Sequence, residues 1–263
     1  MENIEDRLKL LSRWREDVTF FLLDYDTKEV IYERNGDILR TIGSMTKLMS
    51  AYVLLEEKLT TPEAWEQMIT IDSECSVMAN NIDLSAYEQF KEGEKRSARE
   101  LLSLCLVPSG CASTLALAKH FYGTEEAFIE RMHEHSRKIG INATFCDCYG
   151  THPGDKCSAR DLSKLAYNLI DRHPEILSIT SMHAVPLHGT DYINTSRLIR
   201  DGLVPGMDGL KSGTTLVSGN CYIGTAKRDG HRYISVVMNA QTTDEQHAET
   251  KALLEYGLSL KNE

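Results

Sequence analysis

The sequence predicts an α+β fold in which an antiparallel sheet is flanked by helices and carries an inserted helical lobe. Strand-like runs occur near both ends of the chain, over 18–35 and 219–240, whereas helical patterns dominate the middle. Each terminal run is a pair of β-rich segments around a turn, so the two pairs can join in one antiparallel sheet. We therefore expect residues 1–263 to form a single domain of two lobes. The sheet lobe is expected at about 1–60 plus 195–263, and the helical lobe at about 61–194.

The first half of the chain supports this order element by element. VTFFLLDYDTKEVIYERN (18–35) predicts a β-hairpin around the turn at 24–27. SMTKLMSAYVLLEE predicts a helix from Ser44 to about Glu57. Ser97 and Glu100 form a capping-box pattern before the apolar run LLSLCL. Pro108, Ser109 and Gly110 then interrupt the helical pattern, which resumes in CASTLALAKHFYG.

The second half adds two helices and the closing strands. Thr124 is placed to cap EEAFIERMHEHSRKIG, which should end at Gly140, and Ser158 starts a helix that ends near His173. GNCYIGTAKRDGHRYISVVMNA (219–240) predicts two strands joined by a turn at 228–230, and a last helix is expected over about 243–260.

Composition excludes several function classes. The chain has 263 residues and a net charge of −10, which disfavours non-specific binding to nucleic acid or to anionic membranes. No apolar run approaches the ~20 residues of a transmembrane helix, so no transmembrane segment is expected. The first residues, MENIEDRLKLLSRW, lack the apolar region of a secretory signal.

The seven cysteines show no regular disulfide spacing. A domain of this size does not need disulfides, so we expect mostly buried free thiols. Cys146, Cys148 and Cys157, with His152 between them, are the one cluster that could suggest a metal. The C-x-C spacing is atypical of structural zinc and no fourth cysteine follows at a suitable interval, so we predict no metal there.

Three short motifs carry residues suited to chemistry. Ser44 and Lys47 lie three positions apart and therefore share a helix face, at an N-terminus that favours a developing oxyanion. A partly desolvated Lys47 could act as the base for Ser44. Ser109 lies on the loop between two helical runs, and Lys211 stands in DGLKSGT just before the terminal strands. Taken alone, the first motif also fits a capped helix, the second an ordinary turn and the third an edge strand.

In order and separation the motifs match SxxK, SxN and K[ST]G, the set of class A β-lactamases and penicillin-binding proteins. Their flanking segments resemble the low-molecular-mass D-alanyl-D-alanine carboxypeptidases over about 18–260, in IGSMTKLMSAYVLLE, LLSLCLVPSGCASTLALAKHFYG, SARDLSKLAYNLI and DGLVPGMDGLKSGTT. The resemblance implies a β-lactamase/transpeptidase-like fold. It also implies a serine peptidase that removes the terminal D-alanine of peptidoglycan-type peptides, needs no cofactor and is acylated by β-lactam antibiotics.

The resemblance also implies roles for individual residues. Ser44 would be the acylated nucleophile, Lys47 its general base, and Ser109 a proton relay to the leaving group. Lys211 would supply positive charge. Ser212, Gly213 and Thr214 would line the substrate site: Ser212 would bind the substrate carboxylate, and the backbone N–H groups of Ser44 and Thr214 would form the oxyanion hole.

Two positions depart from the family pattern. Cys111 stands where the second motif normally ends in asparagine, and a thiol donates and accepts hydrogen bonds only weakly. Gln241 occupies the position at which relatives often carry an arginine for the substrate carboxylate. Both departures affect substrate binding. A nearby Lys47 could also lower the pKa of Cys111 and make it reactive, as an alternative to a cysteine that only fills space.

Three alternatives remain open at this stage. A class A-like β-lactamase shares the motifs but needs a further glutamate that no segment identifies. A penicillin-recognising binding or sensor domain could have lost activity through Cys111 and Gln241. For location, the resemblance implies the periplasm or cell surface if a leader was removed, whereas the missing signal segment would fit a cytoplasmic protein.

Overall fold

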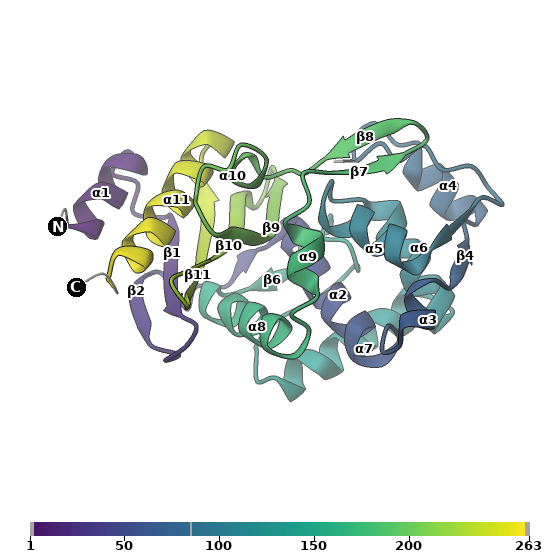
Figure 1. Cartoon of the computed structure of the whole chain (residues 1–263), viewed down its shortest axis with the longest axis horizontal. Coiled ribbons are helices and arrows are strands. Elements are labelled where there is room, and N and C mark those ends of the chain that lie inside the picture. The colour runs from purple at the N-terminus through teal and green to yellow at the C-terminus, as the bar shows by residue number, and fades with distance from the viewer. Residues whose placement is uncertain (1–2, 85, 261–263) are drawn as a thin grey trace.

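The computed structural model describes residues 3–84 and 86–260 and has a sheet lobe beside a helical lobe (Figure 1). Five strands form one antiparallel sheet in the order β2-β1-β11-β10-β9. Its strands are β1 (Thr19–Asp24), β2 (Val30–Arg34), β9 (Met207–Thr215), β10 (Gly219–Arg228) and β11 (His231–Ala240). The antiparallel sheet made from both ends of the chain, predicted from the sequence, is confirmed.

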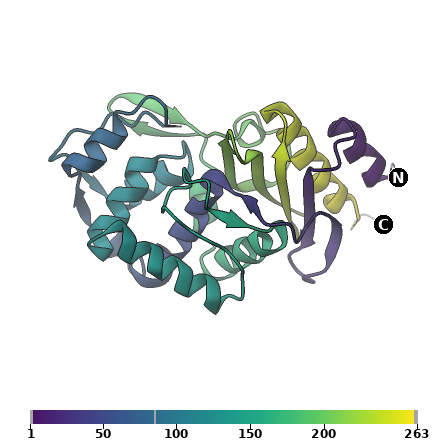
Figure 2. The ribbon, with the colours of Figure 1, turned by 180° about the vertical axis from the view of Figure 1, so that it is seen from behind.

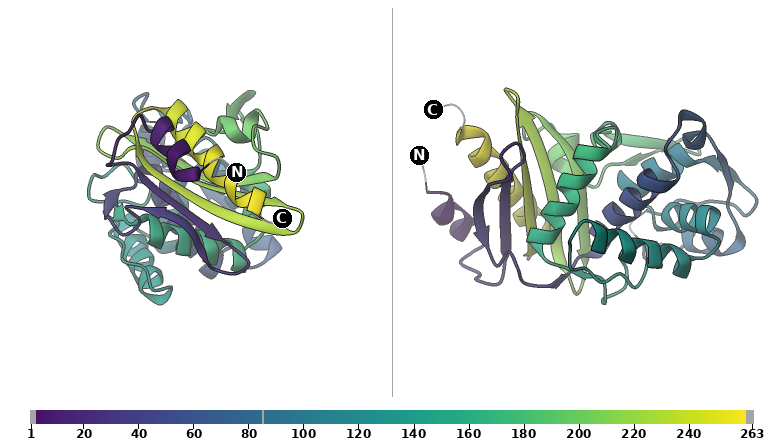
Figure 3. Two further views of the ribbon diagram at one scale, coloured as in Figure 1. Left: turned by 90° about the vertical axis from the view of Figure 1, so that its left-hand side faces the viewer. Right: turned by 90° about the horizontal axis from the view of Figure 1, so that it is seen from below.

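Helices cover both faces of this sheet, as Figure 3 shows. One face carries α1 (Ile4–Leu11) and α11 (Thr243–Ser259), which pack on each other and on the strands. The other face carries α8 (Ala159–Arg172), in contact with β1 and β11. The first and last described helices, α1 and α11, lie side by side at one end of the molecule (Figure 2).

The helical lobe is built around α2 (Thr46–Glu57), which contacts α5, α7 and α8. Its other helices are α3 (Pro62–Trp65), α4 (Ser73–Ala79), α5 (Ala98–Leu106), α6 (Cys111–Tyr122), α7 (Glu125–Lys138) and α9 (Ile176–Thr180). Small strand pairs lie at its edges, β4 (Met68–Thr70) with β5 (Lys95–Ser97) and β7 (Ala184–Leu187) with β8 (Thr190–Ile193). The remaining short elements are β3 (Arg40–Thr41), β6 (Lys156–Cys157) and α10 (Arg197–Arg200).

Local sequence signals explain where the main elements begin and end. Ser97 and Glu100 form the predicted capping box at α5, with the Glu100 N–H 3.2 Å from Ser97 Oγ and the Ser97 N–H 2.9 Å from Glu100 Oε2. Thr124 caps α7. Asp229 and Gly230 both have positive φ, as the tight turn between β10 and β11 requires.

The packing joins the two lobes rather than separating them. One apolar cluster extends from Phe21 and Leu23 on the sheet through α2 and α8 into the helical lobe. A second cluster fills the space between the sheet, α1 and α11. The predicted lobe limits therefore remain a prediction, since both α2 and α8 pack across that division. Among the described residues, no helix combines the length and the apolar character needed to cross a membrane.

Candidate active site

Ser44 lies on a single 3-10 turn, η1 (Gly43–Met45), that leads directly into α2. The helix predicted to start at Ser44 therefore starts two residues later. The turn is fixed by its neighbours: Gly43 has φ +57°, and a Cβ on Gly150 would overlap the Gly43 carbonyl oxygen. Ser44 stays 8% exposed at the open end of a helix that is otherwise buried along most of its length.

Lys47 is completely buried one turn below Ser44. Its Nζ is 3.1 Å from Ser44 Oγ, 2.6 Å from the Tyr149 carbonyl oxygen and 3.5 Å from Cys111 Sγ. These three acceptors match the three N–H donors of an ammonium group. In the neutral amine, two donors suffice for Tyr149 and Cys111, which leaves the lone pair facing the Ser44 hydroxyl. The geometry therefore suits proton transfer from Ser44 to Lys47.

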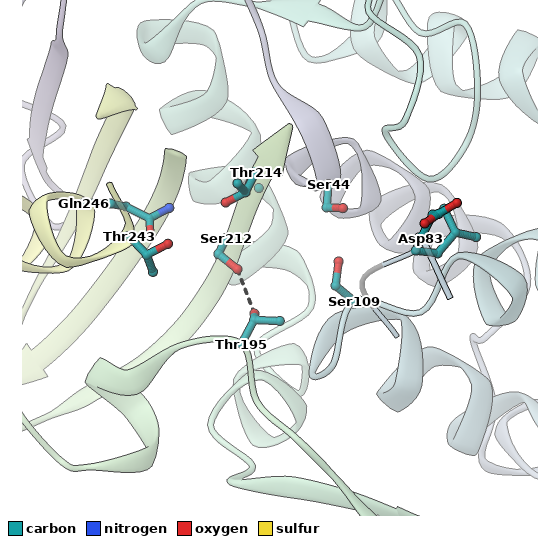
Figure 4. Close-up of a pocket in the computed structure, with 10 residues that line it drawn as sticks. Ser44, Asp83, Ser109, Thr195, Ser212, Thr214, Thr243 and Gln246 are labelled. Carbon is teal, nitrogen blue, oxygen red and sulfur yellow. Dashed lines mark hydrogen bonds between the residues drawn. The ribbon is translucent and has the colours of Figure 1, made fainter. Parts of the chain in front are cut away.

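The second motif forms the loop between α5 and α6. Ser109 has φ +71°, which is uncommon for a residue other than glycine. Its Oγ is buried and has no hydrogen-bond partner within 3–84 and 86–260. Figure 4 shows this hydroxyl across a gap from Ser212, on the same side as Ser44. Because this hydroxyl has no partner, it is free to donate a hydrogen bond to a substrate or to accept one from it.

Cys111 begins α6 and lies beside Lys47, and of the two alternatives for this thiol the structure favours a cysteine that only fills space. Burial raises the pKa of the Cys111 thiol, and this outweighs the opposing effect of the Lys47 charge. Only 1% of the residue is exposed. The site therefore holds Cys111 as a neutral thiol that packs against Lys47.

Glu88 binds the start of α6 and so supports the loop between α5 and α6; no sequence motif identified this residue. Its carboxylate accepts hydrogen bonds from the backbone N–H groups of Ala112 at 2.9 Å and Ser113 at 3.1 Å, and from the Ser113 hydroxyl. It thereby caps α6 from a distant loop. Burial raises the pKa of Glu88 to about 7, although these hydrogen bonds act in the opposite direction. A Cβ on Gly110 would overlap this carboxylate, so a larger residue there would displace the Glu88 side chain from α6.

Lys211, on β9, is the second buried amine of the site. Its Nζ donates to the Ser212 carbonyl oxygen at 3.0 Å. Burial, followed by the positive charge of Lys47, lowers the pKa of Lys211 to about 7. At neutral pH, a positive charge on both Lys47 and Lys211 is therefore unfavourable.

The third motif runs along the nucleophile turn. A Cβ on Gly213 would lie 2.6 Å from the Ile42 carbonyl oxygen and 3.1 Å from the Ser44 nitrogen, so only glycine lets β9 approach so closely. A Cβ on Gly43 would lie 3.4 Å from the Thr214 nitrogen. The backbone nitrogens of Ser44 and Thr214 are thus neighbours, as an oxyanion hole formed by both would need.

A cavity of about 390 Å³ opens between the lobes at this point. It is lined by Ser44, Asp83, Leu84, Ser109, Thr195, Ser212, Gly213, Thr214, Thr243 and Gln246. Lys47, Cys111 and Lys211 lie buried behind this lining. Ser212 Oγ is 2.7 Å from Thr195 Oγ1, a hydrogen bond visible in Figure 4.

Gln241, expected at the substrate carboxylate, is exposed after the end of β11 and does not line the cavity. Thr243 and Gln246, at the start of α11, occupy that side instead. Asp83 and Thr195 were also missed by the sequence motifs. They come from loops with no distinctive pattern, so only the folded chain reveals them.

The comparisons with known proteins agree with this geometry. The Peptidase_S11 family, described as D-alanyl-D-alanine carboxypeptidase, matches residues 16–242, which is most of the chain. The chain belongs to this family. The D-alanyl-D-alanine carboxypeptidase DacD of Escherichia coli K12 is 29% identical over 245 residues, covering 91% of this chain and 62% of the relative. The chain thus spans about three fifths of the length of the first curated family members that it matches.

Solved structures of family members show the same fold. Penicillin-binding protein 5 of Haemophilus influenzae superposes with a TM-score of 0.85 at 28% identity, over 92% of this chain and 70% of that one. Penicillin-binding protein D2 of Listeria monocytogenes, solved in an ampicillin-bound form, gives 0.80 at 28% identity over 91% and 96%. The predicted β-lactamase/transpeptidase-like fold is confirmed.

Proposed function

We propose that this chain is a serine D-alanyl-D-alanine carboxypeptidase that cleaves the terminal D-alanine of peptidoglycan-type peptides through an acyl-enzyme on Ser44. The observation that carries the proposal is the 3.1 Å contact between Ser44 Oγ and a buried Lys47 Nζ at the wall of the cavity. Membership of the Peptidase_S11 family supports the same reaction.

In the acylation step, Ser44 Oγ attacks the carbonyl carbon of the peptide bond, and its proton passes to Lys47 Nζ, which acts as the general base when it is unprotonated. The oxyanion that forms lies next to the backbone nitrogens of Ser44 and Thr214. Such donors typically contribute ~3–4 kcal/mol to the transition state. When the C–N bond breaks, Ser109 relays a proton to the leaving D-alanine amine. Water then attacks the serine ester, which releases the shortened peptide and regenerates Ser44.

Recognition of the substrate carboxylate rests on hydroxyl groups and on Lys211. Ser212 and Thr214 line the cavity, and Thr243 faces it from α11. A carboxylate bound here would favour the charged form of Lys211, whose pKa in the free protein is about 7. No arginine is among the residues that line this cavity in the described part of the chain. A weaker hold on the free carboxylate than a bidentate arginine gives is therefore expected.

The β-lactamase alternative has less support. Such an enzyme needs a carboxylate that activates the deacylating water. Glu88 is buried behind the second motif and hydrogen-bonded to α6, so it does not reach the cavity. Asp83 is the one acidic residue among those that line the cavity in the described chain. The retained Ser44–Lys47 contact likewise argues against a purely binding or sensory domain.

A substrate of the cell wall implies an extracytoplasmic location. This part of the proposal rests on the family. Detecting the native chain in the periplasmic or surface fraction of its cells would support it, and finding it only in the cytosolic fraction would contradict it.

The activity is tested by release of D-alanine from a peptide that ends in D-Ala-D-Ala. A matched peptide that ends in D-Ala-L-Ala serves as the stereochemical control. We expect the terminal alanine to be released from the first peptide only, and from neither peptide by the Ser44→Ala variant. Rapid turnover of penicillin without D-alanine release would instead indicate a β-lactamase. Absence of both activities would favour the binding domain.

A further inference from the structure

The loop between α7 and α8 carries a second cluster of reactive side chains, outside the cavity described above. Cys146 Sγ, a ring nitrogen of His152 and a carboxylate oxygen of Asp155 all lie within 4.8 Å of one another. Cys146 and His152 are exposed, and Asp155 is buried. We propose that these three residues bind a divalent metal ion of the zinc type.

The loop is already held in the shape that such a site needs. The Asp147 carboxylate accepts the backbone N–H groups of Tyr149, Gly150, Thr151 and His152, so it fixes the turn that carries the histidine. The Asp155 carboxylate accepts the Cys146 N–H at 2.6 Å. The two ends of the loop are therefore tied together before any ion binds.

Gly154 shows that the thiol and the imidazole turn toward one point. A Cβ on this glycine would lie 2.6 Å from Cys146 Sγ and 2.9 Å from His152 Nδ1. The Gly154 N–H donates to His152 Nδ1 at 3.0 Å, so it occupies the lone pair of this nitrogen, and the bond has to break before Nδ1 can bind an ion. The His152 ring therefore has to rotate for one of its nitrogens to bind the ion.

The donor set indicates which ion would bind. A thiolate, a neutral imidazole and a carboxylate are the ligands of zinc sites, where three protein ligands plus water are a common arrangement. Bonds of ~2.0–2.3 Å in a tetrahedron place the donor atoms about 3.5 Å apart. The cluster must therefore contract by about 1 Å, which rotation of the exposed Cys146 and His152 side chains can supply. The Cys146 proton is released to solvent on binding.

The sequence alone suggested a different ligand set. His152 was grouped there with Cys146, Cys148 and Cys157, and no metal was expected. In the structure Cys148 and Cys157 are both buried in the main apolar cluster, and neither belongs to the group of described residues that could share an ion. Asp155 replaces them as the third ligand, because the loop returns it to the side of Cys146.

The cluster is also connected to the catalytic residues. Asp155 accepts a hydrogen bond from Thr46 Oγ1 at 3.1 Å, and Thr46 lies between Ser44 and Lys47 on the chain. The same loop supplies the Tyr149 carbonyl that binds Lys47. An ion at this site would therefore clamp the segment that positions the base. The metal site itself does not depend on the proposed peptidase activity.

Cobalt(II) titration of the chelator-treated full chain tests the proposal, because a cobalt–thiolate bond gives a charge-transfer absorption band. We expect a band that saturates at one ion per chain and is lost when Zn²⁺ is added in competition. Cys146→Ser should abolish the band, since Cys146 is the exposed one of the seven cysteines. His152→Gln should raise the Kd for Zn²⁺ at least about tenfold.

The control is His183→Gln, which removes an exposed histidine far from the loop in sequence and should leave the Kd unchanged. Bound Zn²⁺ should also raise the thermal midpoint of the wild-type chain and of His183→Gln, but not of Cys146→Ser. No saturable band in the wild-type chain would overturn the proposal. So would a band or a Kd that Cys146→Ser leaves unchanged.

Discussion

Replacement of Lys47 by methionine tests the proposed base directly. Methionine fills a similar space in the buried site but has no amine, so the Ser44 hydroxyl loses its partner at 3.1 Å. A positioned general base typically contributes a factor of about 10²–10⁴ to a rate. This corresponds to about 3–5 kcal/mol of activation free energy. We expect acylation by a fluorescent penicillin, followed under single-turnover conditions, to slow by that factor.

The same change should lower stability, because the Tyr149 carbonyl loses its 2.6 Å hydrogen bond from Lys47. A buried acceptor left without a partner costs about 1–3 kcal/mol. Thermal unfolding of the variant therefore has to be measured beside the rate, so that a folded fraction can be established. Lys58→Met, which alters a partly exposed lysine at the end of α2, is the matched control.

Lys47→Arg separates proton transfer from charge. The guanidinium keeps the positive charge but does not lose its proton near neutral pH. We expect this variant to be as slow as Lys47→Met. An acylation rate within tenfold of wild type in either folded variant would show that Lys47 is not the base.

Three further predictions follow from the buried polar groups. Cys111→Asn should accelerate D-Ala-D-Ala cleavage, because an amide oxygen accepts from Lys47 Nζ better than the sulfur at 3.5 Å; a lower rate in steady-state assays would show that the thiol has a function of its own. Glu88→Gln should destabilise the fold by about 1–3 kcal/mol in urea unfolding, because an amide cannot accept all the N–H bonds at the start of α6; unchanged stability and acylation would show that Glu88 does not hold the loop. Burial, followed by the charge of Glu245, raises the pKa of Glu249 to about 8. The stability that the protonated Glu249 contributes is complete below its ordinary pKa and is lost as pH rises through about 8. Glu249→Gln should therefore gain stability relative to wild type as pH rises from about 5 to about 8; a difference that stays constant over this range would contradict the assignment.

Much of the fold was predictable because its signals are local. The hairpin at β1 and β2, the capping box at Ser97 and the turn at Asp229 and Gly230 depend on residues close together in sequence. Ser44 and Lys47 were likewise recognisable, because one helical turn brings them together whatever the rest of the chain does.

What the sequence missed is set by tertiary packing. Glu88 reaches α6 from a loop more than twenty residues earlier, and Thr243 and Gln246 reach the cavity from the last helix. The choice between a reactive and a space-filling Cys111 was open in the sequence for a related reason. Proximity to Lys47 was inferred correctly, but the burial that outweighs the lysine charge depends on packing that no motif encodes.

Mass spectrometry of the penicillin-treated chain tests the central claim most directly. Intact mass followed by peptide mapping should find one adduct per chain, on Ser44. The adduct should disappear in Ser44→Ala and persist in Ser178→Ala, which alters an exposed serine on α9. An adduct on another residue, or an undiminished adduct in folded Ser44→Ala, would contradict the assignment of Ser44 as the nucleophile.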